Sequence, residues 1–510
     1  MRAAQKIVHT YANPVVSGFH PDPSICRAGD DYFLVHSTFE LFPGVPVYHS
    51  RDLVHWRLIG HCLTRENQLD LTGIKTSAGI FAPTIRYHDG VFYMITTVMG
   101  GRGNFYVTAR DPAGPWSDPV WLDEEGFDPS LFFDDDGTVY YTRHAGDQRG
   151  AIAQTTLDLQ KGTLQGEVRE IWKGTGGIWP EGPHLYKLNG KYYLLISEGG
   201  TSYGHMLTIA RSDSPRGPFE ACPRNPILSH RGRPRHLFQA LGHADMVQTP
   251  DGWWMVCLGI RPWRGKYHHL GRETFLTSLS WSEDGWPVVR DVESSMPAPR
   301  LPEHPFPAPP ERDDFNATAL GLQWNYLRNP KPAGYSLTER PGFLRLKGGE
   351  TSLGSIDSPV FVGRRQEHMT CRAAAVLDFI PREENEEAGL ALRGNERNYF
   401  ALGLLLRHGK RRLMYRRVLA GRMKTRLLAE LPDRGSVILT VKATPSRYEI
   451  CYCSEGGKET RAAVEKPSAL ATEKIGGFTG VYFGMYATGN GKTCTTPADF
   501  DWFEYHGSIV

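Results

Sequence analysis

Four chemically active side chains each stand just ahead of an apolar run in the first half of the chain: Asp22, Asp128, Glu181 and His243. Alone, each has an ordinary explanation, because an Asp before Pro is usually a turn residue and an isolated His is usually a hydrogen-bonded core residue. Three carboxyl groups brought together desolvate and repel one another, so that their pKa values separate into an acid and a base. If the fold gathers these residues, we expect general acid–base catalysis.

An internal repeat gives a reason for them to converge. Five segments share the pattern of a small or polar residue ahead of an apolar strand: Asp22-Pro-Ser-Ile, Ala82-Pro-Thr-Ile, Asp128-Pro-Ser-Leu, Glu181-Gly-Pro-His-Leu and His243-Ala-Asp-Met. They are 60, 46, 53 and 62 residues apart, which suits four strands per unit. Each is followed by a turn and an aromatic strand. The repeat predicts a five-bladed β-propeller whose innermost strands direct their opening residues to one centre.

Composition limits the partners. The chain has 510 residues, 40% of them hydrophobic, with a formal charge of +2, which describes a globular protein without a field for nucleic acid or anionic membranes. Residues 1–14 lack the apolar core of a signal peptide and no run is long enough to span a membrane, so we expect a cytoplasmic protein. Eight cysteines are too few for a disulfide scaffold, and no zinc-type cluster of ligands is recognised.

A proline-rich segment divides the chain. Seven prolines fall within residues 297–310, where neither a helix nor a sheet ladder can persist. We therefore predict a propeller over residues 1–296, a linker over 297–312 and a second domain over 313–510. Alternating strands and turns in the last part predict two packed antiparallel sheets, a lectin-like (jelly-roll) β-sandwich. The expected fold is all-β throughout.

The motifs in this order resemble those of glycoside hydrolase family 43, in particular its β-xylosidase branch. The resemblance covers nearly the whole chain. It rests on the opening segment 13–27 and on Ser37-Thr38-Phe39-Glu40, Phe127-Asp128-Pro129-Ser130, Trp179-Pro180-Glu181-Gly182-Pro183-His184, Gly242-His243-Ala244-Asp245 and Leu270-Gly271-Arg272-Glu273-Thr274.

The resemblance implies a role for each carboxyl group. Asp22 would be the general base, Glu181 the general acid, and Asp128 the third carboxylate that tunes and orients the acid. Cleavage through an oxocarbenium-like state needs a proton for the leaving oxygen and a carboxylate for the attacking water. The family inverts configuration, which requires roughly 6.5–9.5 Å between acid and base.

The resemblance also implies a sugar pocket. Arg272 would donate to a sugar hydroxyl or restrain the charge on Asp128. The pocket would be lined by Phe39, Phe81, Ala82, Thr201 and by Phe478, on a loop that the sandwich sends over the pocket. His243 matches a histidine that touches a central metal ion, often calcium. No cofactor is expected for the chemistry itself, and the sequence leaves open whether a structural calcium ion is bound.

Two departures affect the substrate. Phe81 and Leu41 stand where similar enzymes carry tryptophan, and smaller side chains there would widen the space around the terminal sugar. The leading interpretation is an inverting, exo-acting β-xylosidase that releases xylose from xylo-oligosaccharides. The alternative is an α-L-arabinofuranosidase, or an enzyme with both activities on arabinoxylan fragments. A sugar-binding propeller without catalysis is a remote third, since all three carboxylates are present. Similar enzymes often form homo-oligomers.

Overall fold

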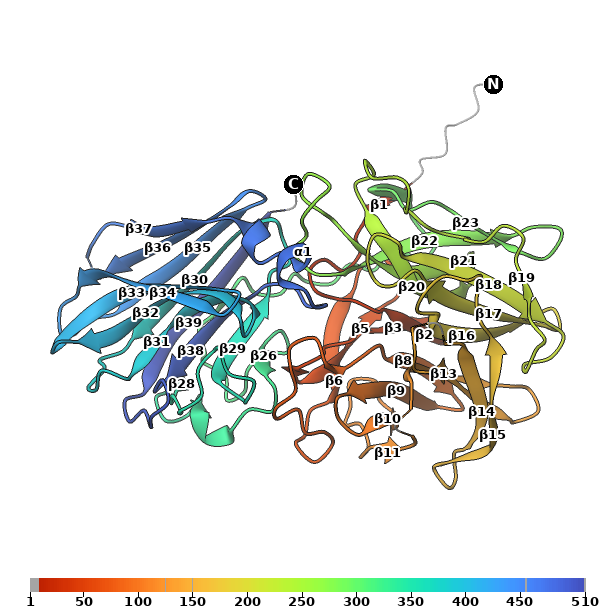
Figure 1. Ribbon diagram of the computed structural model, residues 1–510, viewed down its shortest axis with the longest axis horizontal. Helices are drawn as coiled ribbons and strands as arrows, with labels where there is room; N and C mark the ends of the chain where they lie inside the picture. The colour runs from red at the N-terminus through yellow and green to blue at the C-terminus, as the bar shows by residue number, and fades with distance from the viewer. Residues whose placement is uncertain (1–8, 124, 149, 455, 509–510) are drawn as a thin grey trace.

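The computed structural model describes residues 9–123, 125–148, 150–454 and 456–508, and it consists almost entirely of β-strands arranged in two bodies (Figure 1). The first body is a ring of antiparallel sheets and the second is a pair of large antiparallel sheets. The predicted five-bladed β-propeller and C-terminal β-sandwich are therefore confirmed.

Each blade is a small antiparallel sheet whose first long strand lies at the centre of the ring. The first blade contains β2 (Ser24–Ala28), β3 (Asp31–Val35), β5 (Gly44–Ser50) and β6 (Arg57–Leu63). The second contains β7 (Gly79–Ile80), β8 (Thr84–His88), β9 (Val91–Met99), β10 (Gly103–Ala109) and β11 (Val120–Trp121). The third contains β12 (Phe127–Phe133), β13 (Val139–His144), β14 (Ile152–Asp158) and β15 (Thr163–Trp172). The fourth contains β16 (Glu181–Leu188), β17 (Lys191–Glu198), β18 (Met206–Ser212) and β19 (Glu220–Ala221). The fifth contains β20 (Gln239–Thr249), β21 (Gly252–Ile260), β22 (Glu273–Trp281) and β23 (Pro287–Val289).

The two ends of the propeller sequence pair with each other. β1 (Thr10–Ala12) runs antiparallel to β24 (Ser295–Pro297), with Tyr11 opposite Met296. Tyr11 and Met296 are both buried, so the pairing covers apolar side chains as well as backbone groups. The linker expected from residue 297 thus begins one residue later than predicted, because Pro297 still belongs to this edge pairing.

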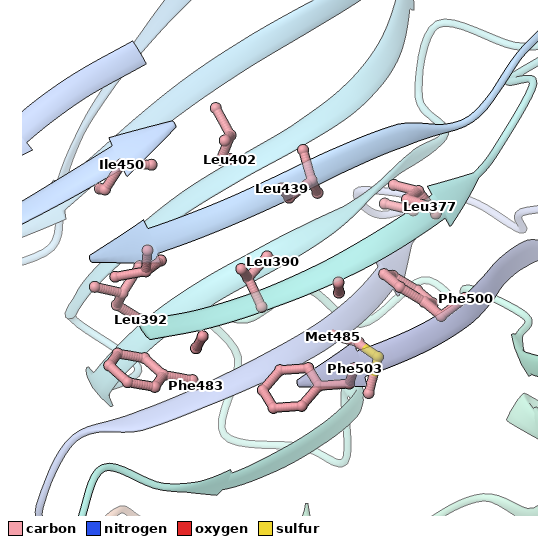
Figure 2. Close-up of a cluster of buried hydrophobic side chains, with 14 of the residues drawn as sticks. Leu377, Leu390, Leu392, Leu402, Leu439, Ile450, Phe483, Met485, Phe500 and Phe503 are labelled. Atoms are coloured by element: carbon pink, nitrogen blue, oxygen red, sulfur yellow. The ribbon is translucent and has the colours of Figure 1, made fainter. Parts of the chain in front are cut away.

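The β-sandwich buries its core between two sheets. One sheet contains β25 (Arg312–Asp313), β27 (Tyr335–Ser336), β28 (Leu344–Leu346), β30 (Thr370–Asp378), β35 (Val437–Thr444), β36 (Arg447–Ser454), β37 (Thr460–Glu465) and β39 (Ala498–Ser508). The other contains β26 (Asn325–Leu327), β29 (Val360–Arg365), β31 (Glu387–Asn395), β32 (Asn398–Arg407), β33 (Lys410–Leu419), β34 (Arg422–Glu430), β38 (Tyr482–Thr488) and one further strand described next. Figure 2 shows inward side chains from both sheets, among them Leu390 and Leu439, in one apolar cluster. Strict alternation along these strands places such residues on the buried face.

A strand from the propeller sequence completes the second sheet. β4 (Leu41–Phe42) pairs with β26, placing Phe42 opposite Tyr326. The backbone N–H of Arg328 then donates to the carbonyl of Glu40 at 2.7 Å. The sandwich is therefore joined to the propeller by a sheet ladder beside Phe39, which is the link that carries its loops to the candidate site.

Helical structure is minor. Among the described residues there is one short α-helix, α1 (Thr472–Ile475), and two 3-10 turns, η1 (Pro332–Gly334) and η2 (Pro467–Ala469). Within this part of the chain, no helix has the length and apolar character needed to cross a membrane.

Candidate active site

The inner strands of the propeller open onto one pocket. Its walls come from all five blades and from one loop of the sandwich, and the lining residues are Asp22, Phe39, Phe81, Ala82, Phe127, Asp128, Glu181, Thr201, His243, Arg272 and Phe478. Every candidate site residue expected from the sequence, apart from Leu41, is in this set. The structure thus brings together side chains that are up to 456 positions apart in the chain.

Asp22 is held by a guanidinium group. Arg272 donates to Oδ1 of Asp22 at 2.7 Å and to Oδ2 at 3.2 Å, and both side chains are buried. Ser37 Oγ donates to Oδ2 as well. Two parallel N–H···O bonds fix both the position and the negative charge of a carboxylate. Arg272 was expected to donate to a sugar hydroxyl or to restrain the charge on Asp128. Its hydrogen bonds go instead to Asp22 and to Thr201 Oγ1, the latter at 2.9 Å.

Asp128, unlike Asp22, accepts no hydrogen bond from a cationic side chain among the described residues and lies close to other carboxyl groups. Burial raises its pKa well above the usual value, and the nearby charges of Glu181 and Asp22 raise it further, while Arg272 opposes the shift. The two aspartates therefore differ in their surroundings: one is paired with a cation, whereas the other is buried beside like charges.

His243 lies between the two aspartates. Its Nδ1 is 3.9 Å from Oδ1 of Asp22 and 3.9 Å from Oδ2 of Asp128. Burial lowers the pKa of this imidazole, although the charges of Asp22 and Glu181 oppose the shift. A neutral ring at this position separates two carboxyl groups without neutralising either.

Glu181 lies one residue before the position that Asp22, Asp128 and His243 occupy in their own blades. Asp22, Asp128 and His243 each have a positive φ of 51°, 53° and 43°, and the matching position of the fourth blade is Gly182, with φ 57°. A Cβ atom on Gly182 would lie 2.9 Å from the His243 ring. The prediction that Glu181 shares the register of Asp22 is therefore wrong by one residue, because the space beside His243 admits only glycine.

His205, which the sequence analysis missed, contacts the Glu181 carboxyl group. Its Nε2 lies 3.4 Å from Oε1 of Glu181, and its Nδ1 lies 3.2 Å from the carbonyl oxygen of Ala240. The ring is fully buried, and a Cβ atom on Gly242 would come within 2.2 Å of it. The signal available in the sequence was the short loop that carries both Thr201 and His205, but nothing in it indicated a contact with Glu181.

Aromatic rings form the wall opposite the carboxylates. Phe478 arrives from the sandwich, with its ring centre 5.7 Å from that of Phe39 and 6.3 Å from that of Phe81, and its backbone N–H donates to Ser77 Oγ at 2.8 Å. The Arg272 guanidinium carbon lies 5.4 Å from the centre of the Phe478 ring. Leu41, expected to widen the pocket, is instead buried behind Phe39, because its strand belongs to the sandwich sheet.

The channel behind the pocket offers a calcium ion few oxygen ligands from the protein. Its carboxylate, Asp245, accepts hydrogen bonds from Arg86 at 2.7 Å, from Ser24 Oγ at 2.6 Å and from Tyr186 at 2.5 Å. Arg86 also reaches Nδ1 of His184 at 2.9 Å. Although burial opposes it, the Arg86 charge holds the pKa of Asp245 below its usual range. Calcium takes six to eight oxygen ligands, water included, whereas the side chains here supply imidazole nitrogens and one carboxylate that already accepts from Arg86, Ser24 and Tyr186.

Three carboxyl groups at the centre of a propeller, two of them buried and one paired with arginine, line a pocket with an aromatic wall, which is the arrangement of a glycoside hydrolase. The family model for glycosyl hydrolases family 43 matches residues 11–287, and the model for the β-xylosidase C-terminal concanavalin A-like domain matches residues 312–506. The chain belongs to glycosyl hydrolases family 43, whose members invert the anomeric configuration.

Individual relatives span nearly the whole chain. A non-reducing-end α-L-arabinofuranosidase of Bacteroides ovatus is 49% identical over 97% of this chain and 94% of its own length. A xylosidase/arabinosidase of Butyrivibrio fibrisolvens is 42% identical over 96% of this chain and 98% of its own. The solved structure of a xylan β-1,4-xylosidase from Bacillus halodurans has a TM-score of 0.93 and 39% identity, covering 97% of this chain and 99% of that one.

Proposed function

We propose that this enzyme is an inverting, exo-acting β-xylosidase that removes single xylose units from the non-reducing ends of xylo-oligosaccharides. Glu181 acts as the general acid that protonates the leaving oxygen. Asp22 acts as the general base that takes a proton from the attacking water. The observation that carries these roles is the different setting of the three carboxyl groups in one pocket, where only Asp22 is paired with a cation.

The steps follow from these settings. Arg272 orients Asp22 through both oxygens, and Oδ1, which accepts from Arg272 alone, retains a lone pair for the water molecule. Burial and the nearby charges of Glu181 and Asp22 raise the pKa of Asp128, so this third carboxyl group resists ionisation beside the acid. Glu181 gives its proton to the leaving oxygen. Nε2 of His205 lies 3.4 Å from Oε1 of Glu181, on one side of the carboxyl group that we assign as the acid.

Exo-action is supported by the closed end of the pocket. Phe478 packs against Phe39 and Phe81 and covers the side on which a longer chain would have to continue. A pocket closed in this way accommodates a terminal sugar. We therefore place the first sugar between the aromatic wall and the carboxylates, and the leaving group on the side of Glu181.

A second candidate is the release of terminal α-L-arabinofuranose. Two observations favour it: Phe81 lines the pocket where similar enzymes carry the larger tryptophan, and the relative with 49% identity is named as an arabinofuranosidase. Both pentoses present hydroxyl groups to the same Arg272 and Thr201. One enzyme with both activities acting on arabinoxylan fragments is consistent with this pocket.

The test is the release of nitrophenol from nitrophenyl β-D-xylopyranoside and nitrophenyl α-L-arabinofuranoside in parallel, with Glu181→Ala as control. Higher kcat/KM on the xyloside supports the leading proposal, and higher kcat/KM on the arabinoside favours the second candidate. Proton NMR of the first product formed checks inversion. Unchanged turnover of natural oligosaccharides by Glu181→Ala would overturn the assignment of the acid.

A further inference from the structure

A second group of metal-binding side chains lies away from the pocket. It joins the segment between β19 and β20 to the segment between β23 and β24. His230, His236 and Asp291 each offer one ligand atom, and these atoms all lie within 4.8 Å of one another. Their positions, H-x5-H with an aspartate 55 residues later, match no zinc spacing recognisable in the sequence. The fold alone brings them together.

The two imidazole rings are oriented by the same carbonyl group. Nδ1 of His230 is 2.8 Å from the carbonyl oxygen of Phe238, and Nδ1 of His236 is 3.2 Å from it. The ring centres are 3.8 Å apart. A carbonyl oxygen has two lone pairs and can accept from both rings. Nδ1 of His236 is also 3.2 Å from the backbone nitrogen of Phe238, whose N–H can donate to it. When Nδ1 of His230 carries the hydrogen, its Nε2 presents a lone pair, which is the tautomer that a metal-binding histidine requires.

The Nε2 atoms face carboxylates. Nε2 of His230 is 2.7 Å from Oδ1 of Asp291, and Nε2 of His236 is 3.4 Å from Oε1 of Glu293. An imidazole lone pair and a carboxylate oxygen repel each other at 2.7 Å unless a proton or a metal ion lies between them. Arg233 donates to Oδ2 of Asp291 at 2.5 Å and leaves Oδ1 directed at the rings.

We propose that His230, His236 and Asp291 form a structural site for a zinc-type divalent cation. Two imidazole nitrogens with carboxylate oxygens are the ligand set of zinc, cobalt and nickel rather than of calcium. Bonds of about 2.0–2.2 Å separate tetrahedral ligands by roughly 3.4 Å, so the His236 and Asp291 side chains draw inward by about an ångström on binding. His230 is fully buried and supplies the fixed ligand.

Such an ion links the segment between β19 and β20 to the segment between β23 and β24. The first histidine segment leads directly into β20, which carries His243. The carboxylate segment lies beside the closure of the ring, where Asn13 donates to the carbonyl groups of Ser294 at 3.1 Å and Glu293 at 3.3 Å. Because the metal replaces the proton between His230 and Asp291, its binding releases a proton.

The test uses the full chain, stripped with EDTA and then titrated with Zn²⁺. We expect one equivalent to bind, with an enthalpy that depends on the ionisation enthalpy of the buffer, and Tm to rise by roughly 5 °C at a hundredfold excess over Kd. His236→Ala and Asp291→Asn should each lose both effects. His55→Ala is the matched control, because His55 pairs with Asp52 at 2.7 Å without joining the cluster.

Two results would overturn the proposal. One is binding of Zn²⁺ to His236→Ala with the same affinity and Tm shift as to the unmodified chain, since the ion would then lie elsewhere. The other is the lack of any Tm shift with Zn²⁺, Co²⁺ or Ni²⁺ in the unmodified chain, which would mean that a proton alone joins His230 to Asp291.

Discussion

Arg272 donates hydrogen bonds to both carboxylate oxygens of Asp22, at 2.7 and 3.2 Å, although the two residues are separated by 250 positions in the chain. The same guanidinium group donates to Thr201, and its carbon lies 5.6 Å from the centre of the Phe39 ring. This one side chain therefore holds the proposed base and contacts two other walls of the pocket.

Replacement of Arg272 by lysine should lower kcat/KM by about 100-fold, because an ammonium group keeps the charge but loses the two-point geometry. Arg345→Lys is the matched control: Arg345 binds Asp499 in the sandwich at 2.7 and 3.0 Å, far from the chemistry, and its replacement should leave kcat/KM unchanged. Steady-state kinetics on a nitrophenyl xyloside measure both. Equal activity of the two variants would contradict the role of Arg272.

His205→Ala should affect substrates according to their leaving group, because His205 contacts the proposed acid. On xylobiose, whose leaving oxygen needs a proton, we expect kcat/KM to fall by about 100-fold. On dinitrophenyl xyloside, which needs no proton, the loss should be under about fivefold. His205→Gln should recover part of the activity. The same loss on both substrates would indicate that the ring only supports the fold.

Phe478→Ala should raise KM by about tenfold with a smaller change in kcat, because the ring closes the pocket around the bound sugar. The KM of Phe478→Leu should lie between the KM of the unmodified enzyme and that of Phe478→Ala. Kinetics on xylobiose and xylotetraose measure the effect. A KM that stays at its original value in Phe478→Ala would show that the loop does not contact the sugar.

The raised pKa of Asp128 predicts how stability depends on pH. A buried carboxyl group whose folded pKa lies above its unfolded value of about 3.9 imposes no cost below that value. The cost grows as pH rises from about 4 toward the folded pKa, since the unfolded chain then loses its proton first. The Tm of Asp128→Asn minus that of the original chain should therefore increase as pH rises from 3.5 to 7.5. A Tm difference that is constant over this range would contradict the shift.

Gly182→Ala should remove most activity, because the new Cβ atom lies 2.9 Å from the His243 ring beside Glu181. Gly190→Ala is the control: its φ is also positive, at 77°, but a Cβ atom there meets open space. Both changes should cost about 1 kcal/mol of stability for the strained backbone. Only Gly182→Ala should lose at least about tenfold in kcat/KM. Equal activity of the two variants would show that the clash is relieved without moving the site.

The propeller and the convergence of its opening residues were predictable from local patterns in the sequence, whereas Arg272, Thr201 and Phe478 were expected only from the resemblance to family 43. A polar residue ahead of an apolar strand, followed by a turn and an aromatic strand, defines each blade within about 60 residues. A ring of such units must direct the opening residues Asp22, Asp128 and His243 toward its axis. The convergence of these residues can therefore be predicted without knowing any distance in the folded protein.

The tertiary structure decided which side chains pair with one another and which residue of each strand faces the pocket. Whether Arg272 binds Asp22 or Asp128, and whether Leu41 faces the pocket or joins the sandwich, depends on contacts between segments hundreds of residues apart, and spacing in the sequence carries no such information. The one-residue offset of Glu181 follows from the volume of the His243 ring, which leaves no room for a side chain at Gly182. His230, His236 and Asp291 likewise meet only because the closing of the ring places β20 beside the segment that precedes β24.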